Sequence, residues 1–424
     1  MSDETKATWR EAVLAILVII LLIRLGGWLL PAVIAAVLLM VVGHELGHFA
    51  TAKWTGMKAT EFFVGFGPRL WSFRRGETEY GIKALPLGGY VRIIGMSSLE
   101  QIDDADEPRS YRAQSYPRRL LVASAGSMMH VIMASLLLFV SFCALGVPDD
   151  SRVRIANFTH WDAYASNAAQ NAGLQRGDEI VAIRNLDTNE NTKVTSAAQL
   201  IAAVGRSSGQ LLNLSVKRDG RELNLEATPV DGRTLKVAGQ VLVASSEPAH
   251  GFLGISLESV NTRVAPWTAV PKVGSTIGTL IKEATLSVPK MFSPHQLGDL
   301  FHNVTNNAAG TQSAQTGNRP VSGVGAVRLA VESAHAGPRE FIALFATLNI
   351  FVGVLNLFPM MPLDGGLVLV ATYERLRTRK GQPPYRADLN RLAPVVFIFL
   401  GILAFTFLTT LYLDIVHPIN NPFQ

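Results

Sequence analysis

Two histidines and a glutamate stand close together in the segment His44-Glu45-Leu46-Gly47-His48. On a helix, positions i and i+4 share a face, so both imidazoles can point at one metal ion. Zinc lowers the pKa of a bound water to about 7, and a neighbouring carboxylate such as Glu45 can take the released proton and pass it to a leaving amine. The pattern therefore predicts a hydrolytic zinc site. The alternative is that the three side chains only cap a helix end at the level of the lipid headgroups.

Asp364 is the candidate for a further ligand, because a catalytic zinc takes three protein ligands and keeps one position open. It is the only charged residue between 341 and 371. Pro359 and Pro362 remove helix hydrogen bonds, and the glycines after Asp364 permit a sharp turn. A broken helix at membrane depth is tolerated where it is buried in protein or lines a wet cavity. The alternative is a kinked span in which Asp364 caps the next helix; with the histidine pair, we favour Zn2+ binding.

The composition predicts that much of the chain lies in a membrane. The 424 residues are 48% apolar and 17% charged, against about 25% charged in soluble domains, and the mean hydropathy is +0.25. The single cysteine, Cys143, excludes a disulfide-built scaffold. A bilayer core about 30 Å thick needs about 20 apolar residues in a helix. Four stretches meet this length, and residues 11–30 are expected to form a helical lead-in at the interface, with an extra hairpin as the alternative.

The expected organisation follows the chain in eight parts. They are 1–50, the lead-in and first transmembrane helix; 51–118, a loop with a β-hairpin; 119–147, the second transmembrane helix; 148–258, a globular α+β domain; 259–338, amphipathic helices and a flexible loop, the loop over the polar stretch 302–320; 339–373, the third, broken transmembrane helix; 374–391, a basic loop; and 392–424, the fourth transmembrane helix and a short tail.

Lysine and arginine in the loops predict the orientation. Residues 51–119 and the loop 374–392 are rich in both, whereas the tail after Leu413 has neither. Basic loops face the cytoplasm, so we expect both termini and the segment 148–338 to lie outside. This topology explains the net charge of +5, and with no recognition motif present we expect no nucleic-acid partner.

Four motifs together resemble a known family. They are the histidine–glutamate pattern at 44–48, Gly65-Phe66-Gly67-Pro68, the run Gly81-Ile82-Lys83-Ala84-Leu85-Pro86-Leu87-Gly88-Gly89-Tyr90-Val91, and the segment from Asn356 to Asp364. The chain resembles the site-2 proteases, which are intramembrane zinc metalloproteases, and most closely the bacterial regulator-of-sigma-E protease branch with one PDZ domain. The single PDZ, and the position of 317–330 before the third span, favour an actinobacterial type.

The resemblance implies a role for each matching residue. His44, His48 and Asp364 would be the zinc ligands and Glu45 the catalytic base. Asn356 stands where the family has a substrate-contacting asparagine, and Pro359 is assigned to the same substrate site.

The resemblance also implies a substrate class and a location. The chain would be a multi-pass protein of the bacterial inner membrane, with its PDZ domain outside the cytoplasm. It would cleave single-span membrane proteins, such as an anti-sigma factor already trimmed on the outside, and the PDZ groove would take a peptide or protein C-terminus. Remnant signal peptides are an alternative substrate class. A non-catalytic PDZ adaptor and a broken-helix transporter are the rival functions, and the transporter would predict an internal repeat that the sequence lacks.

Alternating apolar residues in 76–95 predict paired strands. The resemblance implies a hairpin that dips into the membrane from the cytoplasmic side, where its edge could pair with an unwound substrate. The alternative is a small hairpin without a catalytic role. Residues 148–255 resemble a circularly permuted PDZ domain, with a helix from Thr195 and a hairpin turn at Asp219-Gly220.

The sequence departs from the family pattern at several places, one of which is a longer N-terminal lead-in. The second proline is at 362 rather than 361, and Leu367 follows the glycine pair where many members have histidine. In the second span, His130 stands where the family has asparagine. His130 either replaces that polar group or only satisfies a hydrogen bond between helices, and we favour the hydrogen bond.

Overall fold

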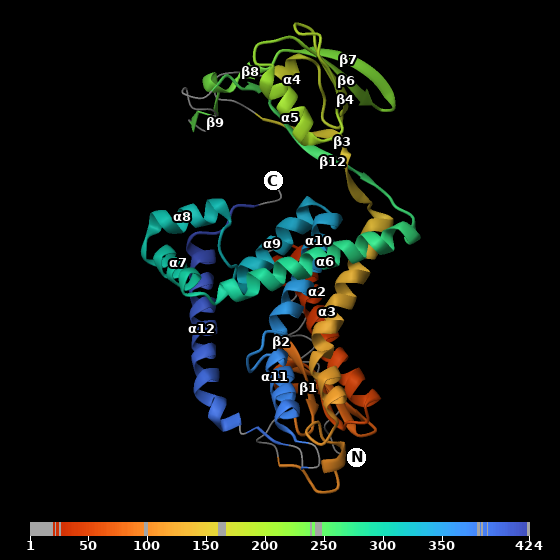
Figure 1. Ribbon diagram of the computed structural model, residues 1–424, viewed down its shortest axis with the longest axis vertical. Coiled ribbons are helices and arrows are strands. Elements are labelled where there is room, and N and C mark those ends of the chain that lie inside the picture. The colour runs from red at the N-terminus through yellow and green to blue at the C-terminus, as the bar shows by residue number, and fades with distance from the viewer. Residues whose placement is uncertain are drawn as a thin grey trace. The chain divides into compact units, whose positions relative to one another are not determined.

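The computed structural model describes residues 20, 21, 23, 24, 27–96, 101–159, 167–237, 240, 241, 248–379, 382, 385–387 and 389–421. The described chain forms two compact units. One combines the chain up to Ser141 with Pro266–Gln424, and the other is Phe142–Ala265 (Figure 1). The lead-in expected at 11–30 falls largely outside the described residues.

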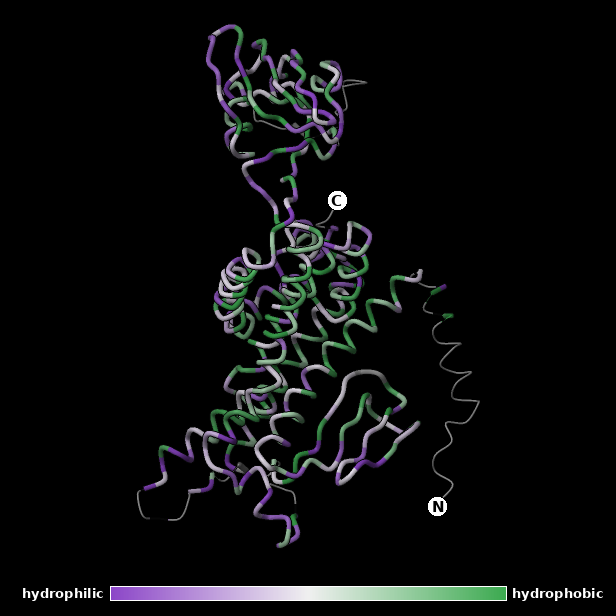
Figure 2. The backbone as a smooth tube through the Cα atoms, turned by 90° about the vertical axis from the view of Figure 1, so that its right-hand side faces the viewer, coloured by the Kyte–Doolittle hydropathy of each residue, from purple (hydrophilic) through white to green (hydrophobic). Residues whose placement is uncertain are grey.

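Four helices in the first unit are long and apolar enough to cross a membrane: α2 (Leu29–Trp54), α3 (Tyr116–Ala144), α10 (Pro338–Asn356) and α12 (Ala393–Val416). Each matches one of the four predicted spans, so the prediction of a polytopic helical membrane protein is confirmed. Figure 2 shows hydrophobic residues concentrated in the helical part of the first unit. At most 28% of each window is buried within the protein, as is typical of helices whose surroundings are lipid.

The third span is broken, as predicted. Helix α10 ends at Asn356, and α11 (Asp364–Arg377) begins after a loop. The backbone of this loop packs directly against the two glycines at the start of α11. A Cβ at Gly365 would overlap the carbonyl oxygens of Leu357 and Phe358. A Cβ at Gly366 would lie 2.6 Å from the Met361 nitrogen. The glycines therefore allow the loop to fold back against the helix that Asp364 begins.

A long hairpin packs beside α2 and consists of β1 (Ala59–Arg75) and β2 (Thr78–Ile93). The second strand lies in the predicted segment 76–95, but the first strand precedes it, so the expectation that both strands lie within 76–95 is wrong. Each strand bends, and residues of β1 have partners on both sides: Phe62 is paired with Val91 and with Tyr80. The early part of β1 is thus a central segment, and residues 89–93 form an edge.

Four helices follow the second unit in the chain: α6 (Pro266–Met291), α7 (Pro294–Thr305), α8 (Asn307–Thr316) and α9 (Gly323–Ala336). Helices α6 and α9 both pack on α10. The flexible loop expected over 302–320 is wrong, since α8 and the end of α7 occupy most of it. The Asn306 side chain caps α8 by accepting from two backbone N–H groups, Gly317 ends it in the left-handed region, and Gly310 packs against His417. Capping and small buried residues thus form a helix where low hydropathy predicted a loop.

The second unit is an α+β fold around a six-stranded sheet. Its strands are β3 (Val147–Phe158), β4 (Glu179–Asn185), β5 (Asn191–Lys193), β6 (Leu212–Arg218), β7 (Arg221–Ala227) and β12 (Ile255–Thr262), in the order β12-β3-β4-β6-β7 with β5 paired to β4. Helices α4 (Ala168–Asn171) and α5 (Ala197–Arg206), with strands β8 (Val230–Asp231) and β11 (Gly251–Phe252), complete the described core elements. Helix α5 and the β6–β7 turn lie where the sequence predicted them.

Candidate metal centre

Helix α2 presents His44 and His48 toward α3, and the close approach of the two helices depends on glycine. A Cβ at Gly47 would lie 2.6 Å from the backbone oxygen of Ala125 on α3. A Cβ at Gly126 would overlap both His44 Cε1 and His48 Nε2. The imidazoles therefore lie directly against the α3 backbone at Gly126.

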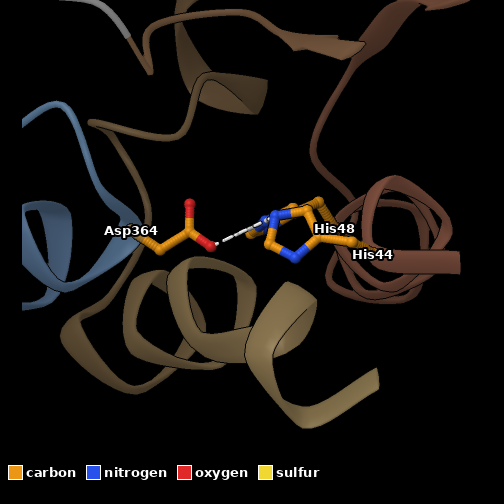
Figure 3. A group of neighbouring side chains, drawn as sticks. All are labelled: His44, His48 and Asp364. Carbon is orange, nitrogen blue, oxygen red and sulfur yellow. Dashed lines mark hydrogen bonds and ion pairs between the residues drawn. The ribbon is translucent and has the colours of Figure 1, made fainter. Parts of the chain in front are cut away.

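The three predicted ligands converge, as Figure 3 shows. Asp364 Oδ2 lies 3.2 Å from His48 Nε2 and 3.4 Å from His44 Nε2, and the two nitrogens are 3.2 Å apart. His48 is buried, and the side chains of His44 and Asp364 are only 12% and 17% exposed. Residues 316 positions apart in the chain thus bring three ligand atoms to one point.

The backbone of α3 fixes the orientation of one imidazole. His48 Nδ1 donates a hydrogen bond of 2.8 Å to the carbonyl oxygen of Val122. Since a carbonyl only accepts, the proton is on Nδ1 and the lone pair of Nε2 faces His44 and Asp364. This is the outer-shell contact that orients metal-binding histidines.

Glu45 does not join the ligand cluster but lies beside it. Its Oε2 accepts a hydrogen bond of 3.1 Å from the backbone N–H of Val91, on the edge segment of β2. Gly89 faces the same side chain, since a Cβ there would lie 3.3 Å from Glu45 Cγ. The hairpin therefore holds the carboxylate in place. This contact could not be predicted from the sequence because its donor is a backbone N–H group.

The two predicted substrate-contacting residues lie at the break in the third span. Asn356 is the last residue of α10 and is half-buried, and Pro359 is exposed in the loop that leads to Asp364. No hydrogen bond joins either one to the three converging side chains within the described part of the chain.

A second polar pair lies next to the cluster. His130 of α3 and Asn349 of α10 are both buried, and His130 Nδ1 donates a 3.0 Å hydrogen bond to Asn349 Oδ1. The Asn349 amide is oriented by its own donation to the Phe345 carbonyl, at 2.8 Å. The preferred prediction for His130, a hydrogen bond between helices, is thus confirmed. Its ring lies 5.1 Å from the His44 ring, so the pair also packs against the cluster.

The donor set suits zinc. Two imidazole nitrogens and one carboxylate oxygen are the ligand types of catalytic zinc sites, in which a fourth position stays open. Their convergence, and the Nδ1 donation that leaves the His48 Nε2 lone pair free, indicate that these residues could hold the ion. The fold and the cluster define a multi-pass membrane protein with a group of side chains that could hold a metal ion.

Comparison with known proteins places this chain in a family. The sequence model of peptidase family M50 matches residues 32–401, and the chain belongs to that family. It is 33% identical over 412 residues to zinc metalloprotease Rip1 of Mycolicibacterium smegmatis, covering 91% of this chain and 96% of the relative. Rip1 of Mycobacterium tuberculosis is 31% identical over 408 residues, with 91% and 96% covered. The protein is therefore a zinc metalloprotease of the intramembrane, site-2 type.

Proposed function

We propose that His44, His48 and Asp364 hold the zinc ion and that Glu45 is the catalytic base. The convergence of the three ligand atoms within 3.2–3.4 Å of one another is the observation that carries this assignment. Bound there, zinc would supply Lewis-acid activation of a water and polarise the scissile carbonyl.

Glu45 performs the proton transfers in this scheme. The Val91 N–H holds its Oε2, which leaves Oε1 to accept a proton from the attacking water and later to deliver it to the leaving amide nitrogen. The contact also fixes the rotamer of Glu45, so the carboxylate is positioned before substrate arrives.

We further propose that substrate binds as an extended strand along residues 89–93. A transmembrane helix hides its peptide bonds, so cleavage requires local unwinding. Residues 89–93 pair with β1 on one side, and Glu45 contacts this segment at Val91. A strand added at this edge would bring its backbone past the catalytic carboxylate. In this arrangement Asn356 and Pro359 contact the substrate from the loop before Asp364.

The second unit is proposed to be an extracytoplasmic PDZ domain, within the 148–258 segment of the chain. Its support is an apolar groove of 310 Å³ between α5 and the segment 250–257, lined by residues such as Leu200, Val204 and Phe252. A groove between a helix and a strand edge suits an extended peptide or a C-terminus. The basic loops at 51–118 and 374–391 support placing the opposite membrane side in the cytoplasm.

The proposed substrate is a single-span anti-sigma factor in the bacterial inner membrane, already trimmed outside. Remnant signal peptides are the second candidate, because they too are short membrane-spanning segments. A non-catalytic PDZ adaptor would not need three converging ligands beside a fixed carboxylate.

A pair of purified proteins tests the catalytic assignment. Wild type and Glu45→Gln are assayed in detergent for bound zinc by mass spectrometry and for cleavage of a single-span reporter. Glu190→Gln, the same change at an exposed position in the second unit, is the control. We expect zinc in all three and cleavage lost only with Glu45→Gln. Equal cleavage by all three would remove Glu45 from the mechanism.

Orientation is tested by cysteine labelling in a Cys143→Ser background. We expect a membrane-impermeant maleimide, applied from outside, to label Thr188→Cys in the second unit but not Gln382→Cys in the basic loop. The reverse pattern would invert the proposed topology.

A further inference from the structure

Two cavities lie where α3 begins and α11 ends, away from the metal cluster. The larger is 440 Å³ and is lined by the first turn of α3, including Tyr116 and Arg119, and by the last turns of α11. The second is 360 Å³. Arg119, Glu374 and Arg386 line both cavities. Their volumes are within the roughly 300–1,000 Å³ of small-molecule sites.

The larger cavity has an excess of positive charge. Three arginines line it, Arg119, Arg375 and Arg386, against one carboxylate, Glu374. Glu374 Oε2 forms an ion pair with Arg119 Nη1 at 2.6 Å and lies 3.8 Å from Arg386 Nη1. Arg375 forms no ion pair with any residue that the structure describes.

One of these guanidinium groups lacks a hydrogen-bond partner, and another is not fully neutralised. Arg119 is only 9% exposed, and its Nε is buried with no hydrogen-bond partner among the described residues. Burial, together with the neighbouring Arg119 and Arg112, lowers the pKa of Arg386 in spite of Glu374. An anion in the cavity would relieve both effects.

The position favours a phosphate group. Helix α3 has 29 residues and is therefore about 43 Å long, which exceeds a hydrocarbon core of about 30 Å and puts its start among the headgroups. Free N–H groups at a helix start carry partial positive charge, and arginine binds phosphate with a planar fork of donors. Basic pockets between transmembrane helices bind anionic headgroups in the same way.

We propose that this cavity binds a phosphate group, supplied by the headgroup of an anionic phospholipid, between Arg119, Arg375 and Arg386. The site is linked to the metal centre because α3 and α11, which line the cavity, also contribute to the metal centre. Helix α11 begins with Asp364, and α3 supplies the Val122 carbonyl that orients His48. A bound headgroup would hold these two helices together at their shared end.

Lipid retention by the full chain tests the proposal. Delipidated protein in detergent is titrated with phosphatidylglycerol or phosphatidylcholine, and bound lipid is counted by native mass spectrometry. The cavity variant is Arg375→Gln with Arg386→Gln, which leaves the buried Arg119–Glu374 pair intact. The control is Arg118→Gln with Arg377→Gln, which removes the same amount of charge at two exposed helical positions, on α3 and α11, that do not line the cavity.

We expect preferential retention of one phosphatidylglycerol, at least about tenfold weaker in the cavity variant and unchanged in the control. A second arm compares thermal unfolding in inorganic phosphate and in chloride of equal ionic strength. If phosphate competes with phosphatidylglycerol, the arginines recognise the phosphate group of the lipid, as proposed. If phosphate binds and the lipid does not, the site belongs to a soluble phosphate compound and the lipid proposal is wrong. If neither probe distinguishes wild type from the cavity variant, the proposal is wrong.

Discussion

At the scale of single residues, the absence of a side chain at Gly126 allows the two imidazoles to lie against the α3 backbone. The α3 backbone lies so close to His44 and His48 that a single added carbon overlaps both rings. We predict that Gly126→Ala lowers zinc affinity and cleavage by at least about 10–100-fold, because the rings must move away from Asp364. Bound zinc and reporter cleavage measure the effect.

Gly401→Ala is the matched control for this change. Gly401 is also a glycine within an apolar helix, α12, but a Cβ there meets nothing within 4 Å. Both substitutions raise helix propensity equally, so only the contact with the histidines differs. Full zinc content and activity in Gly126→Ala would show that the α3 backbone does not constrain the ligands.

The sequence was sufficient to identify three candidate ligands but not the backbone groups that orient the site. Helical spacing put His44 and His48 on one face, and the isolated charge of Asp364 in an apolar run made it the third candidate. The Val122 carbonyl and the Val91 N–H leave no trace in the sequence, because any residue type supplies the same backbone group. Asn349 was missed for another reason: its partner His130 identifies it only once α3 and α10 are packed together.

At the scale of elements, the His130–Asn349 hydrogen bond joins α3 to α10. We predict that Asn349→Leu destabilises the protein by about 1–3 kcal/mol, because His130 Nδ1 would remain buried without an acceptor. The thermal unfolding midpoint in detergent measures this loss. Thr347→Val, an exposed hydroxyl deletion on the same helix, should change stability by no more than about 0.5 kcal/mol. Equal effects of the two substitutions would contradict a specific link between the helices.

The hairpin is attached to the end of α2 by an ion pair network. Hydrogen bonding to Arg109, aided by Lys53, lowers the pKa of Glu77 to about 2. A depressed carboxyl pKa stabilises the fold above the unfolded value of 4.5, and that contribution is lost as pH falls toward 2. The network is partly exposed, so its contribution is at most about 1 kcal/mol.

We therefore predict that Glu77→Gln is less stable than wild type at pH 7 and that the difference vanishes as pH falls from 4.5 to 2. Unfolding midpoints are compared with chelator in every sample, so that metal loss does not contribute. Glu283→Gln, an exposed carboxylate on α6, is the control and should show no such trend. A difference that stays constant over this pH range would assign it to packing rather than to charge.

Strongly periodic elements were predictable, whereas elements fixed by local capping or by pairing were not. Uncharged runs predicted all four membrane helices because the bilayer imposes their length. The polar helix α8 was missed because its stability comes from the Asn306 cap, the Gly317 terminus and small buried residues. The first strand of the hairpin was missed because β1 is paired on both sides and does not alternate simply between two faces.

At the scale of the whole molecule, the second unit is an insertion between α3 and α6. Its first and last strands are antiparallel neighbours, with Val147 paired to Thr262, so the chain enters and leaves the unit at one place. The sequence predicted this insertion from the strand, helix and turn pattern of residues 148–255, which stand between the second and third apolar runs. Because the two connections are adjacent, a short linker can replace the second unit without displacing α3 or α6 in the first unit.

We predict that replacing 148–261 by a short glycine–serine linker keeps zinc binding and the cleavage of trimmed single-span reporters. We propose that the second unit excludes substrates that still carry a large outer domain, because the substrate proposed above is one already trimmed on the outside. The shortened protein should therefore also cleave an untrimmed reporter, which the full chain leaves intact. Parallel assays with both reporters measure this selectivity, and Glu45→Gln in the shortened protein controls for contaminating proteases. If the shortened protein still leaves the untrimmed reporter intact, the size restriction lies within the first unit.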